Sequence, residues 1–118
     1  MSRSESPPFV HLHVHSEYSI LDGACRVPAL VEKAARLEMP AVALTDHGSL
    51  AGAVELYREA RKAGVKPILG CEAYVADDRT KQAKGYNHLT LLAESLEGYG
   101  NLIKLSSLGY LEGYYYKP

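Results

Sequence analysis

The chain has 118 residues, the length of one modest domain, and 47% of them are hydrophobic, which is enough to build a core. Thirteen basic residues nearly balance 14 acidic ones, so the composition excludes a strongly basic nucleic-acid-binding segment and an acidic disordered tail. No apolar run is long enough to cross a membrane, and the polar start lacks the features of a secretory signal. Cys25 and Cys71 do not make a disulfide framework. We therefore expect a cytoplasmic protein that does not contact a membrane, with a flexible leader over 1–8.

Short apolar strands alternate with amphipathic helices along the chain. Pro28 suits the first turn of a helix, and Gly64 is well placed as a helix C-terminal cap. A polar stretch over 77–87 indicates a loop or a loose hairpin. In chain order, the patterns predict strands at 9–15, 41–44, 65–75 and 88–93, and helices at about 28–37, 49–63 and 96–108.

This order of strands and helices predicts an α/β fold built from right-handed βαβ units around a parallel sheet. Four strands do not distinguish an open sheet from a barrel, and four are too few to close a barrel. We therefore expect the chain to be part of a longer structure.

Three histidines alternate with apolar residues in the first predicted strand. His11, His13 and His15 would share one face of a strand, because side chains at i and i+2 point to the same side. Two imidazoles at this spacing can bind one metal ion from a single strand. The alternative is a half-buried strand whose histidines face polar surroundings, but three histidines in register favour a metal site.

Further candidate ligands lie near the ends of the other strands. Parallel α/β folds build their sites where the carboxyl ends of the strands meet. Asp22 follows the first strand, Asp46 and His47 follow the second, and Glu72 lies late in the third. His88 opens the fourth strand, so it fits this rule only if that strand begins earlier or runs antiparallel to the others.

Some of these candidates have plain structural alternatives. His11 lies deepest in its strand and could equally be a core residue or a supporting residue. Asp46 would point away from His47 in an extended segment, which favours a helix cap or an orienting role over a ligand role. Glu72 is costly to bury without a partner, which favours a metal ion or a cation beside it.

Nitrogen and carboxylate ligands without a thiol suit zinc, manganese or iron. Clusters of such ions activate water at neutral pH and bind the oxygens of a phosphate ester. The residues therefore favour phosphoester hydrolysis, and hydrolysis of carbon–nitrogen bonds remains an alternative.

Seven stretches of the chain resemble a known family when they are taken together. The first four resemble the opening motifs of the polymerase and histidinol phosphatase (PHP) domain. The last three resemble the amino-terminal segment of bacterial replicative DNA polymerase III alpha subunits. The first set comprises 13–16, 19–23, 45–48 and 70–72, and the second comprises 86–93, 98–105 and 113–118.

The resemblance implies a distorted barrel of seven βα units, of which residues 9–118 would form the first half or so. It also implies a site for up to three divalent metal ions, with zinc and manganese as the expected metals. Glu72 would be the bridging carboxylate, whereas His11 and Asp46 would be doubtful or supporting residues. The implied ligands are His13, His15, Asp22, His47, Glu72 and His88.

The resemblance further implies a DNA-directed DNA polymerase of DNA replication, with 3′–5′ exonuclease (proofreading) capacity in the metal-binding domain. Its expected partners are DNA, the sliding clamp and a separate proofreading subunit. The later ligands of the family and its polymerase carboxylates fall outside these 118 residues, so we expect the chain alone to be inactive. The alternatives are a stand-alone histidinol-phosphatase-like enzyme and a non-catalytic scaffold for a proofreading subunit.

Overall fold

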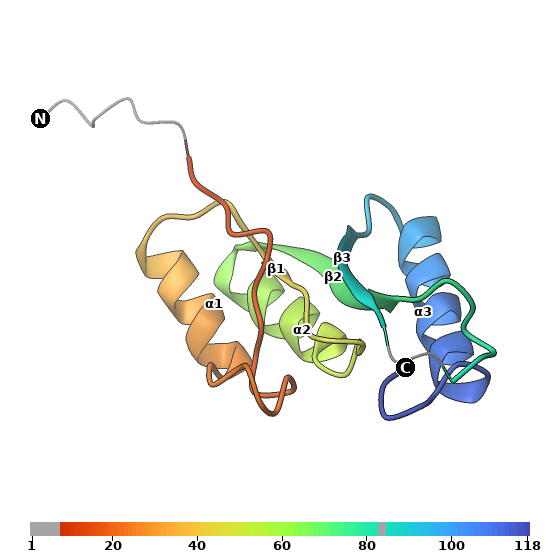
Figure 1. Ribbon diagram of the computed structural model, residues 1–118. Helices are drawn as coiled ribbons and strands as arrows, with labels where there is room; N and C mark the ends of the chain where they lie inside the picture. The colour runs from red at the N-terminus through yellow and green to blue at the C-terminus, as the bar shows by residue number, and fades with distance from the viewer. Residues whose placement is uncertain (1–7, 83–84) are drawn as a thin grey trace, which may run out of the picture.

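A computed structural model describes residues 8–82 and 85–118 of the chain. Apart from Pro8, the expected leader lies outside the described residues. The helices are α1 (Val27–Arg36), α2 (Ala53–Ala63) and α3 (Leu96–Leu111), and the strands are β1 (Ala41–Leu44), β2 (Lys66–Val75) and β3 (Asn87–Leu92) (Figure 1).

The three strands form one mixed sheet in the order β1-β2-β3. β1 runs parallel to β2, with Ala41 opposite Lys66, and α2 makes the crossover between them. β3 runs antiparallel to β2 and places His88 opposite Tyr74. The start of β3 therefore lies beside the carboxyl end of β2, which is the antiparallel arrangement that brings His88 to the predicted edge.

The helices pack against one face of the sheet. Val31 of α1 and Leu56 of α2 are buried with Val42 of β1 in the hydrophobic core, and Leu69 of β2 packs against this cluster. Side chains alternate along a strand, so Leu69 and Cys71 share the face that carries the helices. The opposite face of β2 carries Gly70, Glu72 and Tyr74, and it is the face on which the candidate ligands lie.

α3 covers the same face further along the sheet. Leu102 is its buried residue, and with Leu105 it borders a small gap against Cys71 and Leu91. The hydroxyl of Ser95 accepts a hydrogen bond from the Gly98 N–H at 3.1 Å and caps the helix. The buried thiol of Cys71 therefore lies beside α3 and close to the backbone of residues 48–49, on the face away from Glu72.

The helix ends follow local chemistry. A proline lies in the first turn of α1, and Gly64 caps α2 in the left-handed conformation, as predicted. α2 begins at Ala53 rather than near Ser49, because the chain makes a turn at 51–52 and the Ser49 hydroxyl accepts a hydrogen bond from the Ala51 N–H at 3.0 Å. α3 continues to Leu111, three residues beyond the predicted end.

The prediction of a regular strand over 9–15 is wrong. The segment runs alongside β1, where the Ala43 N–H donates to the His11 carbonyl at 3.0 Å and the Thr45 N–H donates to the Val14 carbonyl at 2.8 Å. The two carbonyl acceptors are three positions apart in this segment, whereas the two N–H donors are two positions apart on the β1 side. This mismatch interrupts the regular backbone pairing of a sheet. The hydroxyl of Thr45 also accepts the Val14 N–H at 2.9 Å, so a side chain satisfies that backbone donor.

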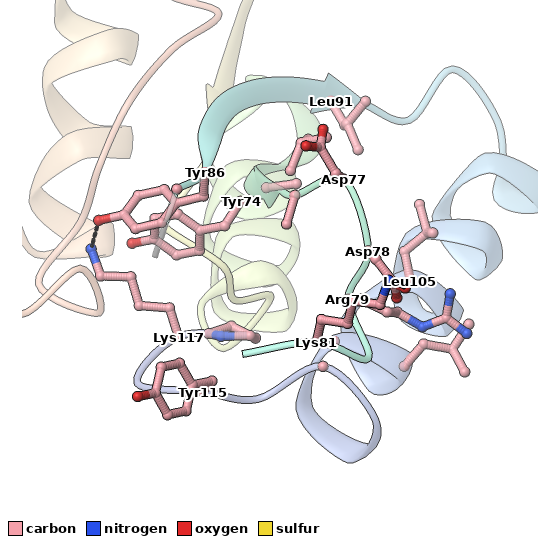
Figure 2. A pocket seen from close by; sticks show the side chains of 18 residues that line it. Tyr74, Asp77, Asp78, Arg79, Lys81, Tyr86, Leu91, Leu105, Tyr115 and Lys117 are labelled. Atoms are coloured by element: carbon pink, nitrogen blue, oxygen red, sulfur yellow. Dashed lines mark hydrogen bonds and ion pairs between the residues drawn. The ribbon is translucent and has the colours of Figure 1, made fainter. Parts of the chain in front are cut away.

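The last residues fold back towards β2 and β3. Lys117 donates a hydrogen bond to the Tyr86 hydroxyl at 2.6 Å. This contact borders a cavity of about 520 Å³ between the loop after β2, the end of α3 and the tail, shown in Figure 2. Among the described residues, no helix has the length and apolar character needed to span a membrane.

Candidate metal centre

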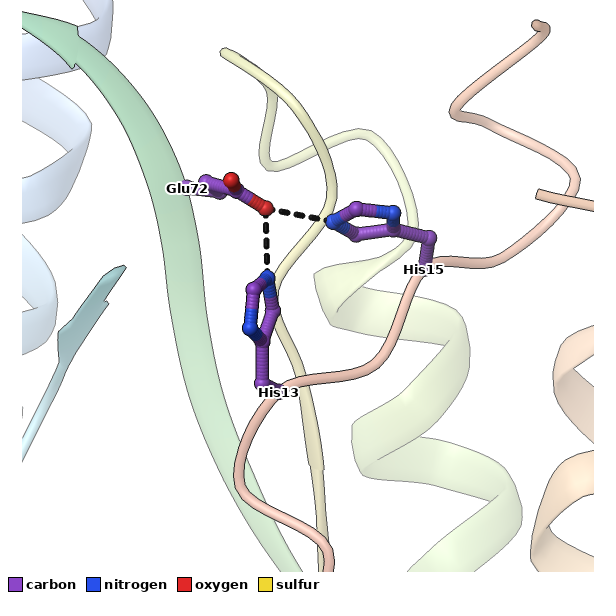
Figure 3. Close-up of side chains that lie close together, drawn as sticks. All are labelled: His13, His15 and Glu72. Carbon is purple, nitrogen blue, oxygen red and sulfur yellow. Dashed lines mark hydrogen bonds and ion pairs between the residues drawn. The ribbon is translucent and has the colours of Figure 1, made fainter. Parts of the chain in front are cut away.

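The centre is built around one oxygen of a buried carboxylate. Glu72 is 5% exposed, and its Oε2 lies 2.6 Å from His13 Nε2 and 2.5 Å from His15 Nε2 (Figure 3). The two imidazoles come from the irregular segment beside β1, and the carboxylate comes from β2. The i, i+2 spacing therefore brings both histidines to one point even though the segment is not a regular strand.

His47 extends the centre to a second carboxylate. Its Nε2 lies 2.9 Å from Asp22 Oδ2, and its Nδ1 lies 3.9 Å from Glu72 Oε2. Within the described part of the chain, His47 Nδ1 is a buried side-chain nitrogen without a hydrogen-bond partner. A buried polar atom of this kind requires an explanation, and a bound ion is one of the accepted explanations.

Backbone pairing places His47 beside Glu72. The Glu72 N–H donates to the Asp46 carbonyl at 2.9 Å, and the Gly48 N–H donates to the Glu72 carbonyl at 2.9 Å. Gly48 then turns the chain with a φ of +57°, and a Cβ there would lie 2.8 Å from Pro118 and 3.0 Å from the Tyr74 ring. Glycine is therefore required at this turn both by conformation and by space.

Asp46 holds the loop that carries Asp22. Its carboxylate accepts hydrogen bonds from the Ser16 N–H at 2.6 Å, the Ser16 hydroxyl at 2.8 Å and the Ser19 hydroxyl at 2.7 Å. The Ser19 hydroxyl also accepts a hydrogen bond from the His47 N–H at 3.1 Å. Asp46 is therefore not a helix cap, and its contacts agree with the orienting role that was one of the sequence alternatives, which remains a prediction.

Three overlapping groups of candidate ligands share residues. Within each group, one ligand atom per residue lies within 4.8 Å of the others. The described groups are His13-His15-Glu72, His15-Asp22-His47 and His47-Glu72-His88.

All six predicted ligands thus occur in these groups, whereas His11 belongs to none of those found among the described residues. His11 is exposed and contacts the ring of Phe9 edge-on at 4.8 Å. The ligand roles of the six predicted residues remain a prediction.

The environment of Glu72 favours the ionised carboxylate. Burial by itself raises the pKa of the Glu72 carboxyl, but the hydrogen bonds to His13 and His15 and the nearby His47 lower that pKa below its ordinary value. The carboxylate is therefore negatively charged at neutral pH.

The donor set fits divalent metal ions. It offers imidazole nitrogens and carboxylate oxygens at the end of the sheet, with an unpartnered nitrogen on His47 directed into the group. Such donors bind first-row transition ions.

Sequence reasoning missed the residues that support and border this centre. Ser16 and Ser19 are buried residues of the loop that carries Asp22, and their hydroxyls donate hydrogen bonds to Asp46. The ring of Tyr74 stacks on His47 with 5.7 Å between centroids and 12° between planes. Tyr86 contacts the rings of both Tyr74 and His88. The alternation of β2, in which Tyr74 follows Glu72 by two residues, could have identified Tyr74.

Comparison with known families explains the arrangement. The model of the PHP domain matches residues 11–118, which is nearly the whole chain. The chain belongs to the PHP domain family. The family and the donor set of this PHP domain both imply divalent metal ions.

The PHP domain is similar in sequence to curated DNA polymerase III alpha subunits. It is 51% identical over 119 residues to that of Borreliella burgdorferi and 50% identical over 119 residues to that of Thermus aquaticus; each match covers 93% of this chain and 10% of the relative. It is 47% identical over 117 residues to that of Helicobacter pylori strain 26695, with 97% of this chain covered. The chain thus spans about a tenth of the length of these relatives.

Solved structures share its fold. A protein described as a metal-dependent phosphoesterase from Bifidobacterium adolescentis matches with a TM-score of 0.58 and 22% identity, over 85% of this chain and 34% of the other. An amidohydrolase from Chromobacterium violaceum, solved with sulfate and without metal, matches with a TM-score of 0.58 and 25% identity, over 87% of this chain and 34% of the other. The predicted fold class, α/β and part of a PHP-type barrel, is confirmed.

Proposed function

We propose that the full-length protein is a replicative DNA-directed DNA polymerase, and that its PHP domain hydrolyses phosphoesters as a 3′–5′ exonuclease. Relatives of this chain at 47–51% identity are DNA polymerase III alpha subunits, which supports the first part. The zinc and manganese preferred by the nitrogen and oxygen donors are the ions we propose for the site. We further propose a cytoplasmic location, with DNA and the other replicase subunits, including the sliding clamp, as partners.

One observation carries the hydrolytic part of this proposal. His13, His15 and His47 surround the single oxygen Glu72 Oε2, at 2.6, 2.5 and 3.9 Å. A scaffold that had lost its metal site would not need an ionised carboxylate buried among three imidazoles. This concentration of ligand atoms supports a functional centre over a purely structural domain.

The residues have different roles in the proposed reaction. Glu72, His13, His15 and His47 would hold divalent ions, and such ions supply charge that stabilises phosphate oxygens and lowers the pKa of water. Asp22 and His88 would complete the ligand set on the open side, where both side chains are exposed. Asp46 keeps Asp22 in reach of His47 by fixing the loop. The exposed side provides the approach for a phosphoester.

The test is hydrolysis of a 5′-labelled single-stranded oligonucleotide by the full-length protein. We expect shortening from the 3′ end that stops when the ions are removed by a chelator and returns when zinc or manganese is added. Glu72→Gln should lower hydrolysis at least about 100-fold, because loss of outer-shell partners alone costs about 10- to 100-fold.

Glu94→Gln, which removes a charge from an exposed carboxylate away from the centre, serves as the matched control and should retain activity. Polymerisation should survive both changes. Hydrolysis that persists in Glu72→Gln would place the activity outside this centre. An untreated protein that neither binds metal nor hydrolyses DNA would leave the scaffold role instead.

A further inference from the structure

Lys117 lies at the border between the candidate metal centre and the cavity of about 520 Å³. Its Nζ is 4.8 Å from the centroid of the Tyr74 ring and 4.6 Å from that of the Tyr86 ring. Figure 2 shows the ammonium group beside the Tyr86 hydroxyl, to which it donates a hydrogen bond at 2.6 Å. Two aromatic rings thus fix the position of an exposed cation.

The other described cations that line the cavity are paired with carboxylates. Arg79 lies 2.7 Å from Glu112, and Lys81 lies 3.6 Å from Asp78. Lys117 instead has a neutral hydroxyl and two rings as its direct contacts, and the negative charge of Asp22 acts on it only at longer range. The hydrogen bond with Tyr86 raises the pKa of Lys117, so the ammonium keeps its charge at neutral pH. Its positive charge is therefore available to an anionic ligand.

Tyr74 connects this cation with the metal centre. One ring contacts both groups, since Tyr74 stacks on His47 and also lies beneath the Lys117 ammonium. Tyr86 makes the same link to His88, with 5.7 Å between ring centroids. Lys117 is therefore one aromatic ring away from the candidate ligands, which is too far for it to be one of them and near enough for it to contact the same substrate.

We propose that Lys117 binds the phosphate that adjoins the scissile phosphate of a nucleic acid strand, and that the cavity beside it receives the attached nucleotide. This inference rests on the proposed hydrolysis of phosphoesters at the centre. A cavity of 300–1,000 Å³ is typical of small-ligand sites, and exposed tyrosine rings are suitable surfaces for nucleotides. Lys117 would thereby favour a polynucleotide chain over a substrate with a single phosphate.

Two matched substrates test this assignment in the full-length protein. The thymidine trinucleotide TpTpT has a phosphate next to the scissile one, whereas the dinucleotide TpT has a single phosphate. We expect Lys117→Met to raise the KM for TpTpT about tenfold, the loss of one charge-assisted contact, with kcat and the KM for TpT within about twofold of wild type. Lys117→Arg should restore the KM for TpTpT, and Lys104→Met, on the exposed side of α3, should change neither substrate.

A second measurement does not depend on turnover. Acetylation of lysines in the metal-loaded wild-type protein, followed by mass spectrometry, should show that TpTpT protects Lys117 and does not protect Lys104. If the wild-type protein hydrolyses neither substrate, the proposed function fails and the protection result alone decides the role of Lys117.

Three results would overturn the inference. The first is an equal rise in KM for both substrates. The second is an unchanged KM for both in Lys117→Met. The third is loss of kcat and of bound metal in that variant, which would show that Lys117 only fixes the tail against Tyr86.

Discussion

At the scale of single residues, two buried carboxylates of the PHP domain have opposite kinds of partner. Asp46 is 1% exposed and is satisfied by hydroxyl and N–H donors from the loop that follows the histidines. Glu72 is 5% exposed and is surrounded by imidazoles, which can equally bind metal ions. The first carboxylate therefore supports the loop, and the second belongs to the centre itself.

Removing the charge of Asp46 should loosen the loop without removing a ligand. Asp46→Asn replaces an ionised acceptor of three hydrogen bonds, and we expect a loss of about 1–3 kcal/mol in the free energy of local opening. Hydrogen exchange of amides 16–23 measures this loss.

The matched control is Asp78→Asn, because exposed Asp78 also accepts an N–H and a hydroxyl, both from Thr80. It should leave the exchange of amides 16–23 within about 0.5 kcal/mol of wild type, as is usual for a distant surface change. Unchanged exchange of that loop in Asp46→Asn would show that Asp46 does not hold it.

Sequence reasoning grouped the six candidate ligands because their residue types are rare in apolar strands and their positions follow strand ends. It could not find Lys117 or Tyr86, since lysine and tyrosine are common on protein surfaces and nothing local distinguishes these two. Their positions depend on the return of the tail to β3, a contact between residues 31 positions apart.

At the scale of elements, the periodic patterns located the helices and the sheet strands well. Each amphipathic helix has to bury one face, and this requirement leaves a periodic pattern in the sequence. α1 and α2 were predictable from leucine, valine and alanine spacing, and the buried β1 was predictable from its continuous apolar run. The direction of β3 was left open, because no local feature of 88–93 specifies which way the strand pairs.

The segment over 9–15 shows where alternation fails as evidence for a strand. Its alternating residues satisfy the strand pattern, but the hydroxyl of Thr45 takes the place of a backbone partner for Val14. That competition comes from a residue 31 positions away, so the local pattern cannot reveal it. The alternation still predicted which histidines lie together.

The pairing of β2 with β3 depends on a close approach at Gly70. A Cβ at this position would lie 2.5 Å from the Leu91 carbonyl oxygen and 2.9 Å from side-chain atoms of Leu92 and Thr45. Gly70→Ala should therefore push β3 away and reduce the protection of its amides by about 1–3 kcal/mol, the usual cost of overpacking.

Gly100→Ala is a control substitution that we expect to stabilise the protein rather than destabilise it. A Cβ at Gly100 meets nothing within 4 Å, and the position lies inside α3. Alanine there should stabilise the helix by about 0.5–1 kcal/mol. Hydrogen exchange of β3 and α3 compares the two variants, and equal protection of β3 in wild type and Gly70→Ala would refute the packing argument.

At the scale of the whole molecule, the fold brings four separate segments to one end of the sheet. The irregular segment supplies His13 and His15, the turn after β1 supplies His47, and β2 supplies Glu72. β3 supplies His88 because it runs antiparallel. Each segment alone is an ordinary loop or strand, and the cluster of candidate ligands arises only from their combination.

The central claim is that this combination holds divalent metal ions. The most direct measurement is anomalous X-ray diffraction from crystals of the full-length protein, recorded at the zinc and manganese absorption edges. We predict anomalous peaks about 2.0–2.2 Å from His13 Nε2, His15 Nε2 and a Glu72 oxygen, since these are ordinary bond lengths to zinc. A protein that hydrolyses DNA yet shows no anomalous peak at these residues, or shows peaks only elsewhere, would contradict the account.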